Sequence, residues 1–217
     1  MTKTAEFFFD VGSPASYLAW TQMPALCAQA GATLVYKPML LGGVFQATGN
    51  ASPAMVPAKG RYMTVDLGRY AQRYGVPFNM NPHFPINTLQ LMRGVIGMQL
   101  RQPQSFEAFL ASIFTALWAK GANLNDPAVV AATLVGAGFD AAEVFSLAND
   151  AAVKAALKAN TEEAVARGVF GAPTVFVGEA MFFGQDRLDF IREALARAPL
   201  SRSWKLTSGQ LQACARS

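Results

Sequence analysis

The chain has 217 residues, of which 52% are hydrophobic and 15% charged, and a formal net charge of +4. This composition excludes a disordered or low-complexity chain, and the length suits one core, or one core with an inserted subdomain. No apolar run approaches the length of a membrane span, no basic stripe is interleaved with aromatic residues, and no signal-peptide cleavage pattern follows the N-terminus. We therefore expect a cytoplasmic protein that binds neither membranes nor nucleic acid.

The N-terminal residues predict a β-α-β unit. Residues 6–11 form a short apolar run that ends at a glycine, which is typical of a buried strand. Ser13 is a natural N-cap and Pro14 a natural first helical residue, so a helix follows at once, and Pro24 is expected to kink or break it. Leu34 and Tyr36 are spaced with a period of two within residues 32–38, which predicts a second strand.

The middle of the chain, from about residue 42 to residue 150, carries helix signals and no strand signals. Asp126 followed by Pro127 predicts one helix start, and Asp140 with Glu143 predicts a capping box for the next helix. A further helix over residues 151–167 leads back to sheet-forming sequence. This stretch is expected to form a helical subdomain.

The C-terminal part predicts a hairpin and a final helix. Residues 174–177 and 181–183 are two short strands separated by a turn that contains Gly178, and a helix is expected to begin near Asp186. The whole order indicates an α/β, thioredoxin-like fold interrupted by an all-helical insertion. We place the thioredoxin-like domain at residues 1–45 and 155–200, the insertion at 46–154 and a flexible tail at 201–217.

The two cysteines, Cys27 and Cys214, lie far apart in the sequence and form neither a C-x-x-C motif nor a metal-ligand spacing. We therefore expect no disulfide and no metal site, and we expect Cys27 to be a small buried apolar residue of the first helix. His83 is the only histidine and lies in a proline-rich loop, and no G-x-S-x-G motif is present. A serine hydrolase is therefore disfavoured.

Five short motifs follow one another along residues 5–198. They are F-F-F-D-V-G-S-P-A-S-Y at residues 7–17, G-N at 49–50, P-A-K-G at 57–60, G-V-F-G-A-P-T at 168–174 and F-F-G-Q-D-R at 182–187. Together these motifs resemble those of 2-hydroxychromene-2-carboxylate isomerases, which are relatives of kappa-class glutathione transferases in the DsbA-like superfamily. The resemblance implies a thioredoxin-like fold and a glutathione-binding site.

The resemblance places Ser13 and Ser16 at the two positions of the redox C-x-x-C motif, so this chain does not exchange a disulfide there. It implies that Ser13 is catalytic and that the reactive sulfur comes from bound glutathione. The Ser13 hydroxyl and the helix N-terminus at Pro14 can stabilise a thiolate together. Taken alone, Ser13 is better explained as a helix cap, and only the accompanying motifs favour the catalytic role.

The resemblance also implies the other contacts of glutathione. Ala172-Pro173 corresponds to a cis-proline dipeptide whose backbone pairs with the tripeptide, although a trans bond is the commoner state of an X-Pro pair. Asn50 and Lys59 are placed beside the backbone and glycyl end. Gln185 and Asp186 are placed at the γ-glutamyl end, where the family usually has Ser or Asn at the position of Gln185. As isolated charges, Lys59 suits a solvated face and Asp186 a helix cap.

The family resemblance implies a glutathione-dependent isomerase that acts on a small aromatic carboxylate similar to 2-hydroxychromene-2-carboxylate, by reversible thiolate addition, in aromatic catabolism. The alternatives are a kappa-like glutathione transferase and a catalytically silent glutathione- or peptide-binding module. Members of the family are dimers, so a homodimer is expected. Four aromatic residues are candidates for a substrate pocket, with a core role the more common fate of each: Tyr17, Phe45, Phe84 and Trp118.

Overall fold

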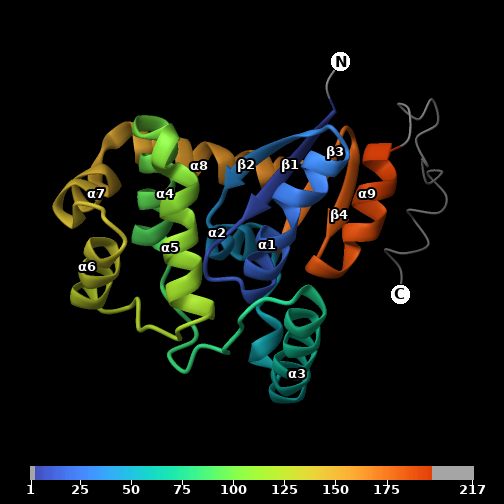
Figure 1. Cartoon of the computed structure of the whole chain (residues 1–217), viewed down its shortest axis with the longest axis horizontal. Helices are drawn as coiled ribbons and strands as arrows, with labels where there is room; N and C mark the ends of the chain where they lie inside the picture. Colours follow the sequence, from blue (N-terminus) through green and yellow to red (C-terminus); the bar gives the residue numbers. More distant parts are fainter. Residues whose placement is uncertain (1–2, 197–217) are drawn as a thin grey trace.

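The structure of the protein is a computed structural model that describes residues 3–196. Its centre is a four-stranded mixed sheet with the strand order β2-β1-β3-β4 (Figure 1). β1 (Thr4–Phe9) pairs in parallel with β2 (Thr33–Pro38) and antiparallel with β3 (Thr174–Val177), which pairs antiparallel with β4 (Ala180–Phe183). The predicted thioredoxin-like order of strands is therefore confirmed, although β1 begins and ends two residues earlier than expected.

Strand β1 is buried on both faces because its side chains alternate between two apolar clusters. Ala5, Phe7 and Phe9 belong to the larger cluster, which includes residues of α1 (Pro14–Gln29), whereas Phe8 belongs to a smaller cluster on the other face. Alternation with a period of two residues is what a pleated strand imposes. The residues that end β1 are thus held between two packed layers, and the loop that follows them has a fixed position.

Helix α1 continues through Pro24 to Gln29, so the helix does not break at this proline, and a kink there stays a prediction. Met23, Leu26 and Cys27, on either side of the proline along the helix, are buried in the main cluster. Their packing outweighs the cost of one missing backbone hydrogen bond. The proline and its missing hydrogen bond are visible in the local sequence, whereas the packing contacts that compensate for it are formed with elements distant in the chain.

The C-terminal elements match the predicted hairpin and helix. Gly178 adopts a positive φ of 59° in the turn between β3 and β4, a conformation that favours glycine. A short 3-10 turn at Gln185–Arg187 then leads into α9 (Leu188–Ala196). The predicted tail at 201–217 and Cys214 lie outside the described residues.

Between β2 and β3 the described chain is helical. The helices are α2 (Leu41–Thr48), α3 (Pro57–Tyr74), α4 (Leu89–Arg101), α5 (Phe106–Trp118), α6 (Pro127–Gly136), α7 (Ala141–Asn149) and α8 (Ala151–Ala166), with 3-10 turns at Pro53–Met55 and Pro103–Ser105. In Figure 1, α4 to α7 stand beside the β2 edge of the sheet and α3 lies below it. Whether these helices form a separate insertion domain stays a prediction.

The predicted helix starts in this region are correct, with one difference in detail. Asp126 accepts a hydrogen bond from the backbone of Ala128, and Asp140 accepts from the backbone of Ala142 and Glu143. Glu143, however, does not complete the predicted capping box, because its carboxylate accepts a hydrogen bond from the amide of Gln102 at 2.6 Å. A tertiary partner has replaced the local one.

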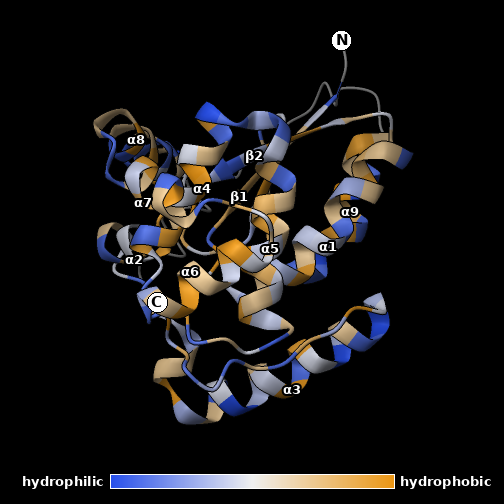
Figure 2. Cartoon of the chain, turned by 60° about the vertical axis from the view of Figure 1, so that its left-hand side comes forward, coloured by the Kyte–Doolittle hydropathy of each residue, from blue (hydrophilic) through white to orange (hydrophobic). Residues whose placement is uncertain are grey.

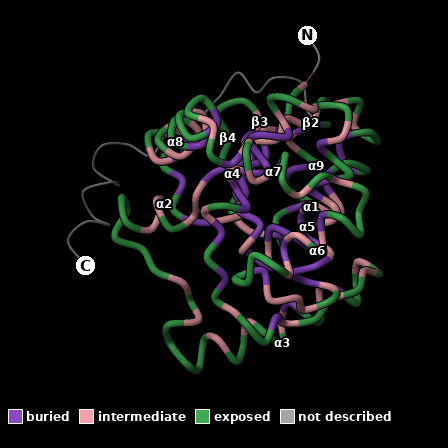
Figure 3. The backbone as a smooth tube through the Cα atoms, turned by 90° about the vertical axis from the view of Figure 1, so that its left-hand side faces the viewer, coloured by how far each residue is buried: buried purple, intermediate pink, exposed green. Residues whose placement is uncertain are grey.

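Helix α3 is a long helix that packs mainly on the surface of the molecule. Only Leu67 and Ala71 of its residues are buried, and Tyr62 and Val65 are largely exposed. Figure 2 shows polar and apolar residues interleaved along α3, and Figure 3 shows its trace mostly in the colours of exposed and intermediate residues. None of the helices described here is long and apolar enough to cross a membrane.

Candidate active site

The loop between β1 and α1 places Ser13 at the first turn of α1. Ser13 has an extended backbone, and its hydroxyl oxygen accepts a hydrogen bond from the N–H of Ser16 at 3.1 Å. The hydroxyl donates to the carbonyl oxygen of Ala172, also at 3.1 Å. Ser13 is therefore the predicted helix cap, and in addition it is joined to a segment that follows it by 159 residues.

The segment that faces Ser13 contains the predicted cis-proline. The Ala172-Pro173 peptide bond is cis, which confirms that prediction. The carbonyl oxygen of Pro173 accepts a hydrogen bond from the N–H of Gly184 at 3.0 Å. The hairpin thus holds this segment in place beside the start of α1.

Ser13 lies in the wall of a cavity of about 930 Å³. The wall is built from the start of α1, from α2 and α3, from the 84–88 segment before α4, and from residues 170–172. Most of the predicted site residues share this wall: Ser13, Asn50, Lys59, Ala172 and Gln185. A cavity of this size, mostly apolar with a few polar groups, is typical of a small-molecule site.

Two of these residues have contacts that fix their backbone surroundings. The amide nitrogen of Asn50 donates to the carbonyl oxygen of Phe170 at 2.7 Å, which ties the end of α2 to the segment before the cis-proline. The carbonyl oxygen of Gln185 accepts a hydrogen bond from the Tyr74 hydroxyl at 2.7 Å. Lys59, by contrast, lies exposed in the first turn of α3 and forms no ion pair with another described residue.

The four candidate aromatic residues divide into two pairs. Tyr17 and Trp118 are buried in the core, where the Tyr17 hydroxyl donates to the Pro77 carbonyl and the Trp118 indole N–H donates to the Val11 carbonyl. Phe45 and Phe84 instead line the large cavity. The expected core role is therefore correct for the first pair, and the second pair forms part of the cavity wall.

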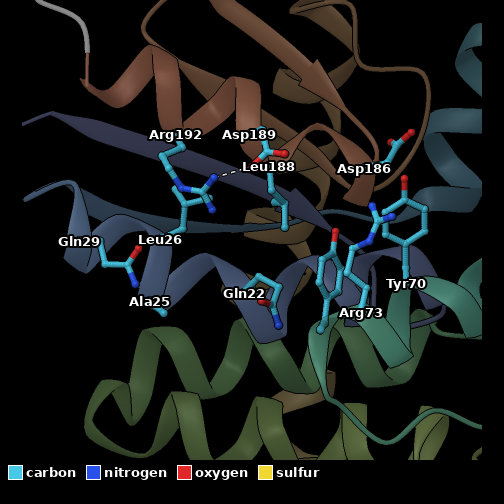
Figure 4. Close-up of a pocket in the computed structure, with 11 residues that line it drawn as sticks. Gln22, Ala25, Leu26, Gln29, Tyr70, Arg73, Asp186, Leu188, Asp189 and Arg192 are labelled. Atoms are coloured by element: carbon cyan, nitrogen blue, oxygen red, sulfur yellow. Dashed lines mark hydrogen bonds and ion pairs between the residues drawn. The ribbon is translucent and has the colours of Figure 1, made fainter.

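Asp186 is not in the wall of the large cavity. Its carboxylate pairs with the neighbouring Arg187 and lines a second, smaller cavity between α1, α3 and α9 (Figure 4). The residue before it, Gln185, is the one that faces the Ser13 cavity. A contact between Asp186 and the γ-glutamyl end of glutathione stays a prediction.

The structure adds Asp10, which the sequence interpretation left out. This residue directly follows β1, three positions before Ser13, is 1% exposed, and lines the large cavity. Its carboxylate accepts hydrogen bonds from the N–H of Gly12 at 2.8 Å, the N–H of Leu41 at 2.8 Å and the Thr88 hydroxyl at 3.0 Å. Burial raises the pKa of Asp10 above its usual range, and these three hydrogen bonds oppose that rise.

Other candidate nucleophiles lie elsewhere or are inert. Burial raises the pKa of Cys27 to about 11, so its thiol stays protonated at neutral pH. Ser16 is fully buried, and its hydroxyl has no hydrogen-bond partner among the described residues. His83 lies in the loop between α3 and α4, outside the wall of the Ser13 cavity.

Comparisons with known proteins identify the family of the chain. The model of the DSBA-like thioredoxin domain matches residues 4–196. A 2-hydroxychromene-2-carboxylate isomerase from Sphingobium xenophagum is 32% identical over 90% of this chain and 99% of its own length. The chain belongs to the 2-hydroxychromene-2-carboxylate isomerase family of DSBA-like thioredoxin domains. The structure of a 2-hydroxychromene-2-carboxylate isomerase superposes with a TM-score of 0.78 at 29% identity, covering 89% of this chain and 95% of that one.

Kappa-class glutathione transferases are also relatives of this chain. Human glutathione S-transferase kappa 1 is 28% identical over 90% of this chain and 92% of its own length. The relatives named here are enzymes, and they include both isomerases and glutathione transferases. These relatives support an enzymatic role for this chain, and they do not decide between isomerisation and glutathione transfer.

Proposed function

We propose that this protein is a glutathione-dependent isomerase of a small aromatic carboxylate similar to 2-hydroxychromene-2-carboxylate, in the breakdown of aromatic compounds. The observation that carries the proposal is the Ser13 hydroxyl, which stands at the N-terminus of α1 in the wall of a cavity whose described lining includes no cysteine. A site with this geometry is suited to a sulfur that arrives with a ligand. The isomerase and kappa-class relatives support glutathione as that ligand.

The residues of the wall are chemically suited to the tripeptide. Glutathione carries two carboxylates and one ammonium group, so its site needs donors for the first two and an acceptor for the third. Lys59 offers a cation, Asn50 an amide, and the turn at Gln185 a helix start for an anionic group. Asp186, adjacent to that turn, is the proposed acceptor for the ammonium group.

Bound glutathione would supply a thiolate that adds reversibly to a conjugated carbon of the substrate, so that rotation about the resulting single bond precedes elimination. The role of Ser13 is to keep that sulfur ionised. Its hydroxyl hydrogen now points to the Ala172 carbonyl, and a rotation about the side chain redirects it to a sulfur in the cavity. A charge-assisted hydrogen bond of about 1.5–3 kcal/mol lowers a thiol pKa by roughly one to two units.

The test compares two serines in the same helical turn. Ser13→Ala should raise the pKa of bound glutathione and lower activity at pH 7, at a stability cost of about 1 kcal/mol for the lost cap. Ser16→Ala is the matched control, because the Ser16 hydroxyl has no hydrogen bond among the described residues and is outside the cavity wall. The measurement is thiolate absorbance in the ultraviolet, titrated against pH in each variant with glutathione bound.

Equal titration midpoints in the wild-type protein and Ser13→Ala would reduce Ser13 to a helix cap and remove the basis of the proposal. A kappa-like transferase is the second candidate, because relatives of that class match the chain over nearly the same length as the isomerases do. Both candidates use the same thiolate. They differ in what becomes of the thiol after each turnover.

A further inference from the structure

The smaller cavity, of about 280 Å³, lies between α1, α3 and α9 (Figure 4). Helix α1 contributes residues 22–29, α3 contributes residues 70–74, and the turn before α9 with α9 itself contributes residues 186–192. The large cavity uses the first residues of α1 and the first half of α3. The two cavities thus lie toward opposite ends of the same two helices.

A glutathione molecule with its sulfur at Ser13 does not reach across the smaller cavity. Gln22, the first α1 residue of its wall, is nine positions beyond Ser13, which corresponds to about 13 Å along the helix axis at a rise of 1.5 Å per residue. The sulfur lies in the middle of glutathione, and even with the longer γ-glutamyl linkage each end of the molecule lies within roughly 10 Å of it. The smaller cavity is therefore separate from the proposed glutathione site except at Asp186, the proposed acceptor for the ammonium group.

The cations and acids of this cavity are unequally paired. Asp189 is paired with Arg192, and Asp186 with Arg187. The exposed side chain of Arg73, in the last turn of α3, forms no hydrogen bond or ion pair with any other residue in the described range. Its guanidinium carbon lies 5.2 Å from the centre of the Tyr70 ring, and that ring contacts the Tyr74 ring at 5.7 Å.

We propose that the smaller cavity binds a small carboxylate with an apolar body, whose carboxylate pairs with Arg73. The Arg73 guanidinium lies over the Tyr70 ring, and its planar shape suits two parallel hydrogen bonds to a carboxylate. Asp189 pairs with Arg192, and Asp186 pairs with Arg187 just outside the wall, so the guanidinium of Arg73 is available to an anionic ligand. Leu26 and Leu188 provide apolar wall for the rest of the ligand.

The two sites meet at the Gln185-Asp186 turn. Gln185 belongs to the wall of the large cavity and Asp186 to the wall of the smaller one, and the Tyr74 hydroxyl holds the Gln185 carbonyl. The proposal does not depend on the proposed function, because it uses residues outside the Ser13 cavity. Occupancy of the smaller cavity should be possible while glutathione is bound.

The experiment titrates the full-length protein with benzoate by calorimetry, in the presence and absence of saturating glutathione. Benzamide, the neutral isostere, serves as the control ligand. Arg73→Gln should weaken benzoate binding at least tenfold. Arg61→Gln is the matched control, since Arg61 is an exposed arginine of the same helix that lines neither cavity and forms no ion pair with a described residue.

The proposal expects benzoate to bind in both titrations, benzamide to bind at least tenfold more weakly, and Arg61→Gln to behave as the wild-type protein. Equal loss of affinity in the two arginine variants would mean that benzoate responds only to overall charge, and would overturn the proposal. Competition by glutathione would also overturn it, because the probe would then occupy the large cavity. Thermal unfolding of each variant separates a binding loss from a folding defect.

Discussion

Asp10 is an acidic residue whose carboxylate is almost completely buried beside the candidate site. Removing a carboxylate from water is costly unless hydrogen bonds replace the lost hydration. Gly12, Leu41 and Thr88 supply three such bonds from three different segments of the chain. Desolvation nevertheless remains the larger effect on the Asp10 pKa, which is raised from its usual value of 3.8.

This raised pKa predicts how stability depends on pH. Between the unfolded and folded pKa values, the folded protein binds more protons at Asp10 than the unfolded chain does, so the stability that this group contributes falls as pH rises. Each unit of difference corresponds to about 1.4 kcal/mol. The unfolding free energy of the wild-type protein should therefore fall, relative to that of Asp10→Asn, as pH increases from 4 to 7 in urea titrations.

Asp150→Asn is a control in which the pH dependence of stability is expected to have the opposite sign. Hydrogen bonds from the backbone of Val153 and Ala152 lower the pKa of Asp150, so the wild-type protein should gain stability relative to this variant as pH rises through the acid range. If both variants gave the same pH dependence relative to the wild type, the assignment of Asp10 as a carboxylate dominated by burial would be wrong.

Lys59 offers a direct test of the proposed glycyl contact. Lys59→Ala should weaken glutathione binding by about 1.5–3 kcal/mol, the usual range for a hydrogen bond to a charged group. Added salt should weaken binding to the wild-type protein more than to the variant. Arg61→Ala removes a neighbouring cation that does not line the cavity, and calorimetry should show its affinity unchanged. Unchanged affinity in Lys59→Ala would place the tripeptide elsewhere.

Among single residues, the sequence motifs predicted some members of the cavity wall and missed others. Ser13, Asn50 and Lys59 were predicted because each lies in a short local motif, and all three line one cavity. Asp10 lies in the same motif as Ser13, but its burial depends on the backbone of Leu41 and the side chain of Thr88, which are 31 and 78 residues away. No local pattern reports such partners.

Helix packing in the middle of the chain can be tested with one substitution at two glycines. Gly97 of α4 faces α7, and a Cβ placed there would lie 2.8 Å from the Cβ of Leu147. Gly68 of α3 has open space around the same position. Alanine is favoured over glycine in a helix by about 1 kcal/mol, whereas overpacking costs about 1–3 kcal/mol.

Gly68→Ala should therefore raise the unfolding free energy by about 1 kcal/mol, while Gly97→Ala should lower it, because the clash outweighs the gain in propensity. Urea unfolding with unchanged m-values is the measurement. Equal gains in both variants would mean that α7 moves freely away from α4. The close packing of these two helices would then contribute little to stability.

The same competition between local and tertiary effects explains which elements were predictable. Helix starts at Asp126 and Asp140 were correct because their capping hydrogen bonds are formed within a few residues. The helix does not break at Pro24 because buried neighbours hold α1 together, and Glu143 pairs with Gln102 of another segment. Errors occur where a distant partner determines the local structure.

At the scale of the whole molecule, the order of elements predicts the sheet but not the shape of the cavity. The order of strands and helices predicted a thioredoxin-like sheet, and the structure has the strand order β2-β1-β3-β4. The shape of the Ser13 cavity depends on how α2, α3 and the 84–88 segment lie over the end of β1, which no sequence period encodes. The expected homodimer stays a prediction, tested by light scattering against a chain mass of 23.2 kDa.

The reaction itself is a property of the complete site and can be decided by counting thiols. An isomerase returns its thiol at the end of each turnover, because elimination reverses the addition. A transferase consumes one thiol for each product molecule, because the adduct persists or a leaving group departs. Covalent catalysis of the first kind requires a sulfur that both adds and leaves, so only a moderate lowering of its pKa is useful.

We therefore predict many turnovers of 2-hydroxychromene-2-carboxylate at substoichiometric glutathione, with the free thiol unchanged at the end of a spectrophotometric assay. Ser13→Ala should slow this reaction at pH 7 and recover part of the rate at higher pH, where solution ionisation of the thiol replaces the missing hydrogen bond. Ser16→Ala should follow the wild-type profile. Loss of one thiol per product would assign the protein to the transferases, and the absence of any dependence on glutathione would refute both reactions.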